Sequence, residues 1–493
     1  MHNDTHIQFR FDNSYRTLPA KLFEECNPTA VAQPQLIILN EVLAKDLGLN
    51  FNGISNEEVA EFLSGNRIIE GAQPIAQAYA GHQFGYFNML GDGRAILLGE
   101  HITPFNQRFD IQLKGSGETP YSRRGDGRAT LSSMLREYII SEAMFALQIP
   151  TTRSLAVVST GEEVHREYTH EGAVLTRIAA SHIRVGTFEF VRRFNDVDTF
   201  KAFTNYTIQR HYPHLLHSEN YALNFLKEVM EKQIDLIVNW MRVGFIHGVM
   251  NTDNTAISGE SFDYGPCAFM NQYHPQTVFS SIDTQGRYAF GNQGAIIQWN
   301  LIRLTEALLP LIDPSEAQAI DMAKSLIQGF EHEWHRIYQH MMAEKIGFTE
   351  ADHETERLVY SLLKLMEEHG TDYTNTFAGL CHSIPIAPSP WEHAAFMEWK
   401  KEWNSYAKNK EITLEERKQL MSTKNPVIIP RNHLVESILS EVEYWGKDTS
   451  YSTRFNEALA IWTNPYRYDE SLIPWMTPPT AEANQAHQTY CGT

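Results

Sequence analysis

Hydrophobic and polar positions follow two different periods along this chain. Over residues 109–114, FDIQLK, apolar and polar residues alternate, which is typical of a strand with two unlike faces. Over residues 223–241, apolar residues recur every three or four positions, which predicts an amphipathic helix. The change of period predicts a strand-rich first part and a helix-rich second part.

The same criteria place further elements in both parts. Short apolar stretches punctuated by glycine predict strands and tight turns over residues 76–100, with more strands at 155–159 and 173–178. In the first part, helical runs are predicted over residues 36–47, 56–63 and 130–147. Downstream, the predicted helices cover residues 298–311, 316–341, 354–368 and 393–407, and residues 385–390 are predicted to form a loop.

Composition narrows the class of protein. The chain has 493 residues, of which 42% are hydrophobic, so it can bury a large core and exceeds the usual size of one domain. A net charge of −19 argues against nucleic-acid or anionic-membrane partners, which require clustered positive charge. The first residues lack a cationic start followed by an apolar run, and no segment reaches about 18 uncharged apolar residues. We therefore expect a soluble cytoplasmic protein.

Residues 245–265, FIHGVMNTDNTAISGESFDYG, place two carboxylates and an amide around a short turn. These are Asp253, Asn254 and Asp263, whose oxygen atoms suit Mg²⁺ or Mn²⁺ bound together with substrate phosphates. The order resembles a protein kinase, in which a His-Arg-Asp loop ends in Asn and is followed by Asp-Phe-Gly. In that register the position of the kinase base holds Val249, which cannot accept a proton. An ordinary phosphotransfer mechanism is therefore disfavoured.

A lysine and a glutamate repeat a second kinase feature. Lys114 ends the alternating strand, and Glu137 lies 23 positions later (137 − 114) within the predicted helix. In kinases such a glutamate orients the lysine against nucleotide phosphates. An exposed lysine and a solvated glutamate are the alternative, since charged side chains are common on surfaces.

Glycines and arginines offer further phosphate contacts. In the Gly-Asp-Gly-Arg turn at residues 91–94, Gly91 and Gly93 would let the backbone approach a phosphate, and Arg94 would add a charged donor. Arg177 and Arg184 could converge on a phosphate chain, from one helix face or from a turn. The alternatives are a turn that only connects strands and arginines that only face solvent.

Long stretches of the chain resemble the SelO family, called YdiU in bacteria. They are AGHQFGYFNMLGDGRAILLGE, QLKGSGETPYSRRGDGRATLSSMLREYIISEAM, LTRIAASHIRVGTFEF, GFIHGVMNTDN, DYGPCAFM, GRYAFGNQGAIIQWNLIRLTEAL and NPVIIPRN. They run in order from about residue 80 to residue 432, which makes the resemblance far more specific than one glycine loop.

The resemblance implies an α+β, kinase-like fold of two lobes. Residues 1–180 would form an N-terminal extension and a strand-rich N-lobe, and residues 181–493 a helical C-lobe with a C-terminal tail. It implies binding of ATP in a reversed orientation and transfer of AMP to Ser, Thr or Tyr hydroxyls of protein substrates, with Mg²⁺ or Mn²⁺. Transfer of UMP from UTP with Mn²⁺, and an inactive nucleotide-binding scaffold, are the alternatives. We expect a monomer.

The resemblance also assigns roles to residues. Asp253 would be the proton acceptor, Asn254 and Asp263 the metal ligands, and Glu137 the partner of Lys114. The nucleotide would be bound by Gly91, Gly93, Arg94, Lys114, Asp126, Gly127, Arg177, Arg184 and Asp263. Because the family commonly carries a cysteine or selenocysteine near the C-terminus, a reversible disulfide between Cys267 and Cys491 is one possibility and two free thiols are the other.

Overall fold

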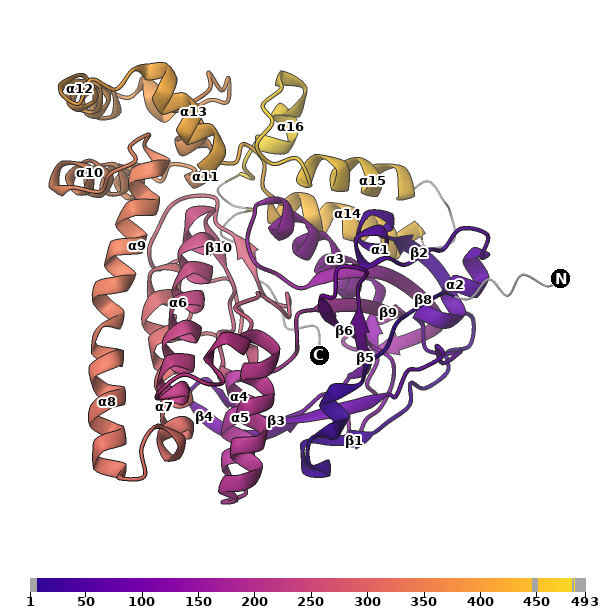
Figure 1. Cartoon of the computed structure of the whole chain (residues 1–493). Helices are drawn as coiled ribbons and strands as arrows, with labels where there is room; N and C mark the ends of the chain where they lie inside the picture. Colours follow the sequence, from indigo (N-terminus) through magenta and orange to yellow (C-terminus); the bar gives the residue numbers. More distant parts are fainter. Residues whose placement is uncertain (1–6, 446–450, 481–482, 484–493) are drawn as a thin grey trace.

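The computed structural model describes residues 7–445, 451–480 and 483, and it shows an α+β protein. A large sheet and a few helices are built from the first part of the chain, and helices dominate the second part (Figure 1). This confirms the predicted change from strands to helices. The described chain thus provides a sheet and a helical layer between which a site can form.

Nine strands form one antiparallel sheet in the order β1-β3-β5-β6-β9-β8-β2, with β4 paired to β3 and β7 to β9. The strands are β1 (Phe23–Glu25), β2 (Gln35–Leu39), β3 (Ile75–Gln83), β4 (Tyr86–Gly91), β5 (Ala95–Ile102), β6 (Arg108–Lys114), β7 (Ala129–Thr130), β8 (Arg153–His165) and β9 (Thr169–Ala179). Strand β6 lies centrally, between β5 and β9, which places the end of this strand in the interior.

The predicted alternation of strand β6 is confirmed, but its polar face is not a solvent face. Ile111 and Leu113 are fully buried on one side, and Asp110, Gln112 and Lys114 are at most 5% exposed on the other. Buried polar groups cost free energy unless they are paired. The polar face of β6 must therefore meet partners inside the protein.

Helix α3 (Leu131–Ala146) supplies some of these partners and packs against β8 and β9. Thr130 caps the helix by accepting a hydrogen bond from the backbone N–H of Ser133, and the helix ends before Pro150, as predicted. Leu135 and Ile139 are fully buried on one face of α3. Burial of each such side chain stabilises the fold by about 1.5–3 kcal/mol. This packing fixes the side of the helix that carries Glu137.

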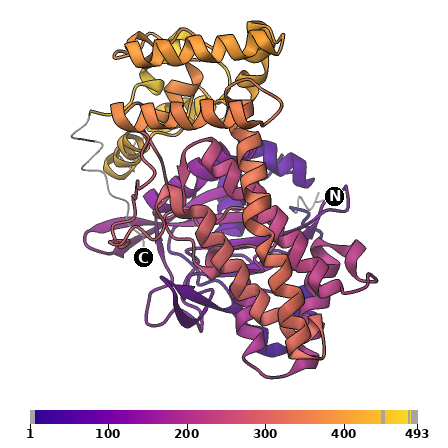
Figure 2. The same ribbon diagram turned by 90° about the vertical axis from the view of Figure 1, so that its left-hand side faces the viewer.

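The helical part contains α4 (Val185–Arg192), α5 (Val197–His211), α6 (Tyr221–Arg242), α7 (Gln293–Ile312), α8 (Glu316–Gln328) and α9 (Phe330–Lys345). It continues with α10 (His353–His369), α11 (Tyr373–Ala378), α12 (Ala394–Asn409), α13 (Leu414–Lys424), α14 (Asn432–Trp445), α15 (Tyr451–Trp462) and α16 (Ile473–Met476). Figure 2 shows α10, α12 and α13, in orange, at the end of the molecule to which the long α9 leads. The apolar stripe predicted for α6 faces the main core, where Leu226 and Ile234 are fully buried.

Two predicted helices differ from the structure. The first run, residues 36–47, begins as strand β2, and only α1 (Glu41–Leu47) is helical, capped by the side chain of Asn40. The β-branched pair Ile37-Ile38 favours a strand, and the cap begins the helix after it. The second run, residues 316–341, is divided at Gly329 into α8 and α9. Helix α2 (Asn56–Leu63) and the other predicted helices are confirmed to within a few residues.

Strand β9 ends at Ala179 and α4 begins at Val185, close to the domain boundary predicted at residue 180. One main hydrophobic core contains buried residues from both sides of that position, so the division into domains stays a prediction.

Among the described residues, the segment Phe290–Ile312 is long and apolar enough to span a membrane. It contains Arg303 and Glu306, and its Leu301 and Leu304 are fully buried in the main core. Core helices of soluble proteins share these properties, so this segment is weak evidence for a membrane.

Candidate active site

Two short strands bring the predicted chemical residues together. Strand β10 (Phe245–Ile246) pairs antiparallel with β11 (Ala268–Phe269), so the chain between them forms a loop that returns to its start. The buried His247 joins the two sides of this loop, since its Nε2 lies 3.1 Å from the carbonyl oxygen of Phe262. The pairing therefore holds the segment around residue 253 near the segment around residue 263.

A buried ion cluster lies where the sheet meets this loop. Lys114 Nζ donates to Glu137 Oε2 at 2.6 Å and also to Asp263 Oδ1. Arg177, from the neighbouring strand β9, donates from Nε to Glu137 Oε1 at 2.7 Å, and its NH2 lies 3.5 Å from Asp263 Oδ1. The predicted pairing of Lys114 with Glu137 is present in the structure, and the alternative of two solvated side chains is wrong.

The cluster keeps its carboxylates ionised. Burial raises the pKa of Asp263, but the charges of Lys114, Arg177 and Arg94 outweigh it and hold this pKa well below its usual value. The pKa of Glu137 is lowered in the same way, because Arg177 and Lys114 offset its burial. Asp263 also adopts a left-handed backbone with φ of 63°. Such strain in a residue other than glycine occurs often at functional sites.

Asp253 has a different environment from Asp263. It is 7% exposed, Gln83 Nε2 lies 3.5 Å from its Oδ2, and within the described chain its Oδ1 has no hydrogen-bond partner. Burial raises the pKa of this carboxyl to about 6, and Arg184 lowers it only partly. Gly81 makes room for it, since a Cβ there would lie 2.2 Å from Asp253 Oδ1. Asp253 is thus a poorly solvated carboxyl whose pKa is raised toward the neutral range, to about 6.

The oxygen atoms near this loop fit a hard divalent cation. Asn254 follows Asp253 in a short 3₁₀ turn, and its Nδ2 donates to the carbonyl of Val249 at 3.0 Å. The ionised carboxylate of Asp263 and the amide oxygen of Asn254 are donors of the kind that Mg²⁺ and Mn²⁺ prefer. Across the described ranges, no group of three or more His, Cys, Asp or Glu side chains could hold a metal by itself. Substrate phosphates would have to complete the coordination.

Arg184 connects the loop to the Gly-Asp-Gly-Arg turn. Its NH1 donates to the carbonyl of Asp253 at 3.3 Å, and its NH2 lies 3.3 Å from Asp92 Oδ1. Its guanidinium is stacked over Tyr79, 3.9 Å from the ring centroid. Arg177 lies on β9 and Arg184 caps the N-terminus of α4, so the two arginines converge from a strand and a turn. The alternative in which they only face solvent is wrong, since both are at most 5% exposed.

The turn at residues 91–94 is covered by the loop that follows it. A Cβ at Gly91 would lie 2.2 Å from the ring of Tyr121, and one at Gly93 would lie 2.9 Å from the carbonyl oxygen of Tyr121. Thr119 Oγ1 donates to the carbonyl of Asp92 at 2.6 Å and holds the loop in place. The missing side chains of these two glycines therefore leave room for the ring and backbone of Tyr121. Their contact with a phosphate stays a prediction.

Asp126 and Gly127 have local partners. Asp126 is bound by two N–H groups of Arg166, at 2.7 and 3.0 Å, and by the backbone N–H of Arg128 at 2.9 Å. Gly127 has φ of 65° and lies against the carbonyl of Gly117, which leaves no room for a Cβ. In the part of the chain that the structure describes, Asp126 makes no contact with the ion cluster, so its role at a nucleotide also stays a prediction.

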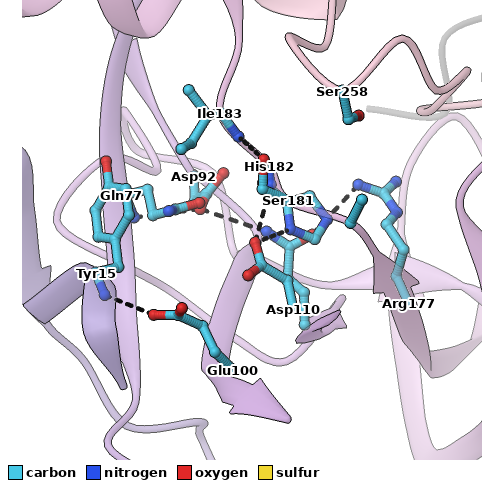
Figure 3. Close-up of polar contacts among 12 residues, drawn as sticks. Tyr15, Gln77, Asp92, Glu100, Asp110, Arg177, Ser181, His182, Ile183 and Ser258 are labelled. Carbon is cyan, nitrogen blue, oxygen red and sulfur yellow. Dashed lines mark hydrogen bonds and ion pairs between the residues drawn. The ribbon is translucent and has the colours of Figure 1, made fainter. Parts of the chain in front are cut away.

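Sequence reasoning missed a polar layer behind the site. The backbone N–H and Nδ1 of His182 each lie 2.9 Å from Asp110 Oδ2, and Asp92 accepts a hydrogen bond from the backbone N–H of Gln77 at 3.2 Å. Figure 3 shows these residues together. Arg210, from α5, donates to Asp110 at 2.6 Å. These contacts tie β6 to α5 and to the segment before α4, and β3 to the turn at residues 91–94. The signal was present in the polar face of β6, since a strand with Asp110 at its centre requires buried partners.

Cys267 lies in the interior. It is fully buried as a free thiol, and burial raises its pKa to about 12. Cys491, its predicted partner, lies outside the described residues. A disulfide between them would require Cys267 to become exposed, and this pairing stays a prediction.

A buried cluster of this kind, with one ionised and one poorly solvated carboxyl, is typical of an enzyme active site. The comparisons identify the family. A family model described as protein adenylyltransferase SelO matches residues 5–459. The chain is 52% identical to the protein nucleotidyltransferase YdiU of Brevibacillus brevis over 98% of both chains, and 50% identical to that of Anoxybacillus flavithermus over 98% of this chain and 99% of the relative.

The YdiU protein of Pelagibacter ubique is 48% identical over 99% of this chain and the whole length of the relative. The chain therefore belongs to the SelO family of protein adenylyltransferases, as its motifs predicted. It is an enzyme of the nucleotidyltransferase class.

Proposed function

We propose that this protein transfers AMP from ATP to Ser, Thr or Tyr hydroxyls of protein substrates and releases diphosphate. The observation that supports this function best is the contrast between two carboxyls of one loop. Asp263 is held ionised among cations, whereas the pKa of Asp253 is raised to about 6. Pairs of carboxyls whose pKa values are pushed apart mark separate catalytic roles. In this proposal Asp263 serves the metal and phosphates, and Asp253 serves the hydroxyl.

The fold in this proposal is kinase-like, with two lobes. The sheet would form the N-lobe with α3, and the helices from α4 onward the C-lobe. Three features support it: the strand order β3-β5-β6-β9-β8, the bond from Lys114 on β6 to Glu137 on α3, and the loop between β10 and β11. The division would fall near residue 180, between β9 and α4.

Cations of the site would bind the triphosphate. Lys114, Arg177 and Arg184 are buried donors that could contact phosphate oxygens once Asp263 turns toward a metal. Arg94, whose charge lowers the pKa of Asp263, lies close enough to share this role, and Gly91 and Gly93 continue the same turn. Asp126 and Gly127 are included because they match the family's nucleotide-binding motif. The loop around them would have to move before they could contact the nucleotide.

Asp253 would take the proton of the attacking hydroxyl. The hydroxyl oxygen forms a bond to the α-phosphorus, the bond from that phosphorus to the leaving diphosphate breaks, and the proton goes to Asp253 Oδ1. This oxygen has no competing partner among the described residues. Mg²⁺ or Mn²⁺ bound by Asn254 and Asp263 would neutralise charge on the phosphates. Val249, buried in the place of a kinase base, leaves this task to Asp253.

The test separates transfer of AMP from transfer of phosphate. Purified protein is incubated with Mg²⁺ or Mn²⁺ and a candidate protein substrate, with ATP labelled at the α- or the γ-phosphate in parallel. We expect label on protein from the α-position only, and its loss in Asp263→Ala. Label from the γ-position would contradict the proposal, and nucleotide binding without label would favour an inactive scaffold. A parallel assay with α-labelled UTP decides between AMP and UMP, since the names of the relatives specify only a nucleotide.

A further inference from the structure

Three arginines lie over two aromatic rings, one on β4 and one on α7. Arg193 lies over the ring of Phe87, with its Cζ 4.6 Å from the centroid. Arg287 and Arg303 both lie over the ring of Trp299, each with its Cζ 5.0 Å from the centroid. We call these five residues the arginine surface. They come from β4, the end of α4, the segment before α7 and α7 itself, so only the fold brings them together.

His82 joins the two halves of the arginine surface. Its ring is edge-on to Phe87 and to Trp299, with a centroid distance of 5.3 Å in each case. After burial, the charges of Arg303, Arg193 and Arg287 contribute to lowering the pKa of His82. All three arginines therefore lie close enough to form one positive region, and they do so on a chain whose net charge is −19.

Most of this positive charge is not neutralised by neighbouring carboxylates. Arg303 pairs with Glu306 at 2.8 Å. Among the residues that the structure describes, Arg193 and Arg287 have no carboxylate within 4.0 Å. Arg193 is exposed and Arg287 is half-buried, so both can be reached from solvent. Guanidinium groups of this kind bind carboxylates through paired hydrogen bonds.

Exposed apolar side chains lie on the strand that carries Phe87. Within the described residues, strand β4 pairs with β3 alone, and it carries Tyr86, 78% exposed, and Met89, 52% exposed. The turn between β3 and β4 lies beside the arginine surface, since a Cβ at Gly85 would lie 3.9 Å from Arg287 Cζ. Aromatic residues, methionine and arginine together are typical of surfaces that bind other proteins.

The arginine surface adjoins the loop that carries the proposed base. The backbone N–H of His82 donates to Thr252 Oγ1 at 2.8 Å, and Thr252 in turn donates to Glu189 Oε2 at 2.5 Å. The next residue along β3, Gln83, contacts Asp253. A polypeptide bound on the arginine surface would therefore pass beside Asp253, where a hydroxyl has to arrive.

We propose that the arginine surface binds an acidic segment that flanks the target hydroxyl of the protein substrate. This inference rests on the proposed function and specifies its substrate. The nucleotide would use a different set of cations, because Lys114, Arg177 and Arg184 are buried and already face Asp263, Glu137 or Asp253. The arginine surface combines the exposed Arg193 with the half-buried Arg287 and Arg303, which suits carboxylates spaced along a polypeptide.

The first experiment measures peptide binding and requires no catalysis. Two fluorescein-labelled peptides are compared by anisotropy, one with Tyr and Ser flanked by Glu and one with the same residues flanked by Lys. We expect the acidic peptide to bind more tightly, and its binding to weaken as salt is raised. Arg193→Ala with Arg287→Ala should weaken it roughly tenfold, because one exposed ion pair contributes up to about fivefold. The single variant Arg193→Ala repeats the test if the double variant does not fold.

A control variant distinguishes local from general charge effects. Arg336→Ala removes an exposed arginine on α9 that pairs with Glu333, and it should leave the affinity for the peptide unchanged. Equal binding of the acidic and basic peptides, or equal loss in the control, would overturn the inference. Loss of ATP binding in Arg193→Ala with unchanged peptide binding would also overturn it, because the surface would then serve the nucleotide.

The second experiment keeps this inference distinguishable from the proposed function. Peptide substrates with acidic or basic flanks are incubated with α-labelled ATP, and we expect label mainly on the acidic ones. Absence of label on any substrate, together with tight binding of the acidic peptide, would contradict the proposed transfer and leave the docking surface standing. Label spread equally over both peptides would contradict the docking surface and leave the transfer standing.

Discussion

Replacing Asp253 by asparagine should stabilise the protein while it removes the proposed base. The pKa of this buried carboxyl is raised from 3.8 to about 6, a difference of 6 − 3.8 = 2.2. At 1.36 kcal/mol for each pKa unit, ionising Asp253 in the folded protein costs about 3 kcal/mol. Asparagine has nearly the same shape and avoids this cost. Since whole domains are stable by only about 5–15 kcal/mol, the effect should be easy to measure.

The size of the effect depends on pH. Well below pH 3.8 the carboxyl is protonated in both the folded and the unfolded state, so the wild type and Asp253→Asn should be equally stable. As pH rises from about 3.8 to 7, the wild type loses stability relative to the variant, by about 1.6 kcal/mol at pH 5 and nearly 3 kcal/mol at pH 7. Nucleotidyl transfer by the wild type should rise over the same range, because only the ionised form accepts a proton.

Urea unfolding in EDTA, from pH 4 to pH 8, measures the difference directly. Asp126→Asn provides a control of opposite sign. Hydrogen bonds from Arg166 lower the pKa of Asp126, so its ionised form stabilises the fold above its unfolded pKa, and that variant should be the less stable one at neutral pH. A stability difference for Asp253→Asn that does not change with pH, or that favours the wild type at pH 7, would refute the reasoning.

The remaining predictions concern neighbouring positions. Glu137→Gln should lower the free energy of unfolding in urea by about 3–5 kcal/mol and abolish transfer, because it breaks the buried pair with Lys114. An active, stable variant would show that the pair is dispensable. Gly81→Ala should lower kcat by roughly 100-fold with ATP binding retained, since the new Cβ would displace Asp253, and an unchanged kcat would contradict this close approach. In the folded protein, Cys267 should resist a thiol reagent until denaturant is added, because it is fully buried; rapid labelling, located by mass spectrometry, would show that the site opens.

The sequence by itself determined the local elements and the family. Alternation in residues 109–114 and helical spacing in residues 130–147 predicted β6 and α3, and with them the elements that carry Lys114 and Glu137. Motifs close together in the chain, such as Asp253 with Asn254, were also readable. Such signals are local because backbone geometry repeats every two or 3.6 residues. The same local signals failed at residues 36–47, where a strand and a capped helix share one apolar run.

Tertiary structure alone decided which polar residues are buried and what they meet. The polar face of β6 could have faced water, yet Lys114 reaches Glu137 at a separation of 23 residues and Asp263 at a separation of 149. The arginine surface joins Arg193 to Arg287 and Arg303, which lie at least 94 positions (287 − 193) further along the chain. Periodicity carries no information about such distances. These contacts exist because packing of the apolar faces fixes where each polar side chain lies, and burial then requires it to find a partner.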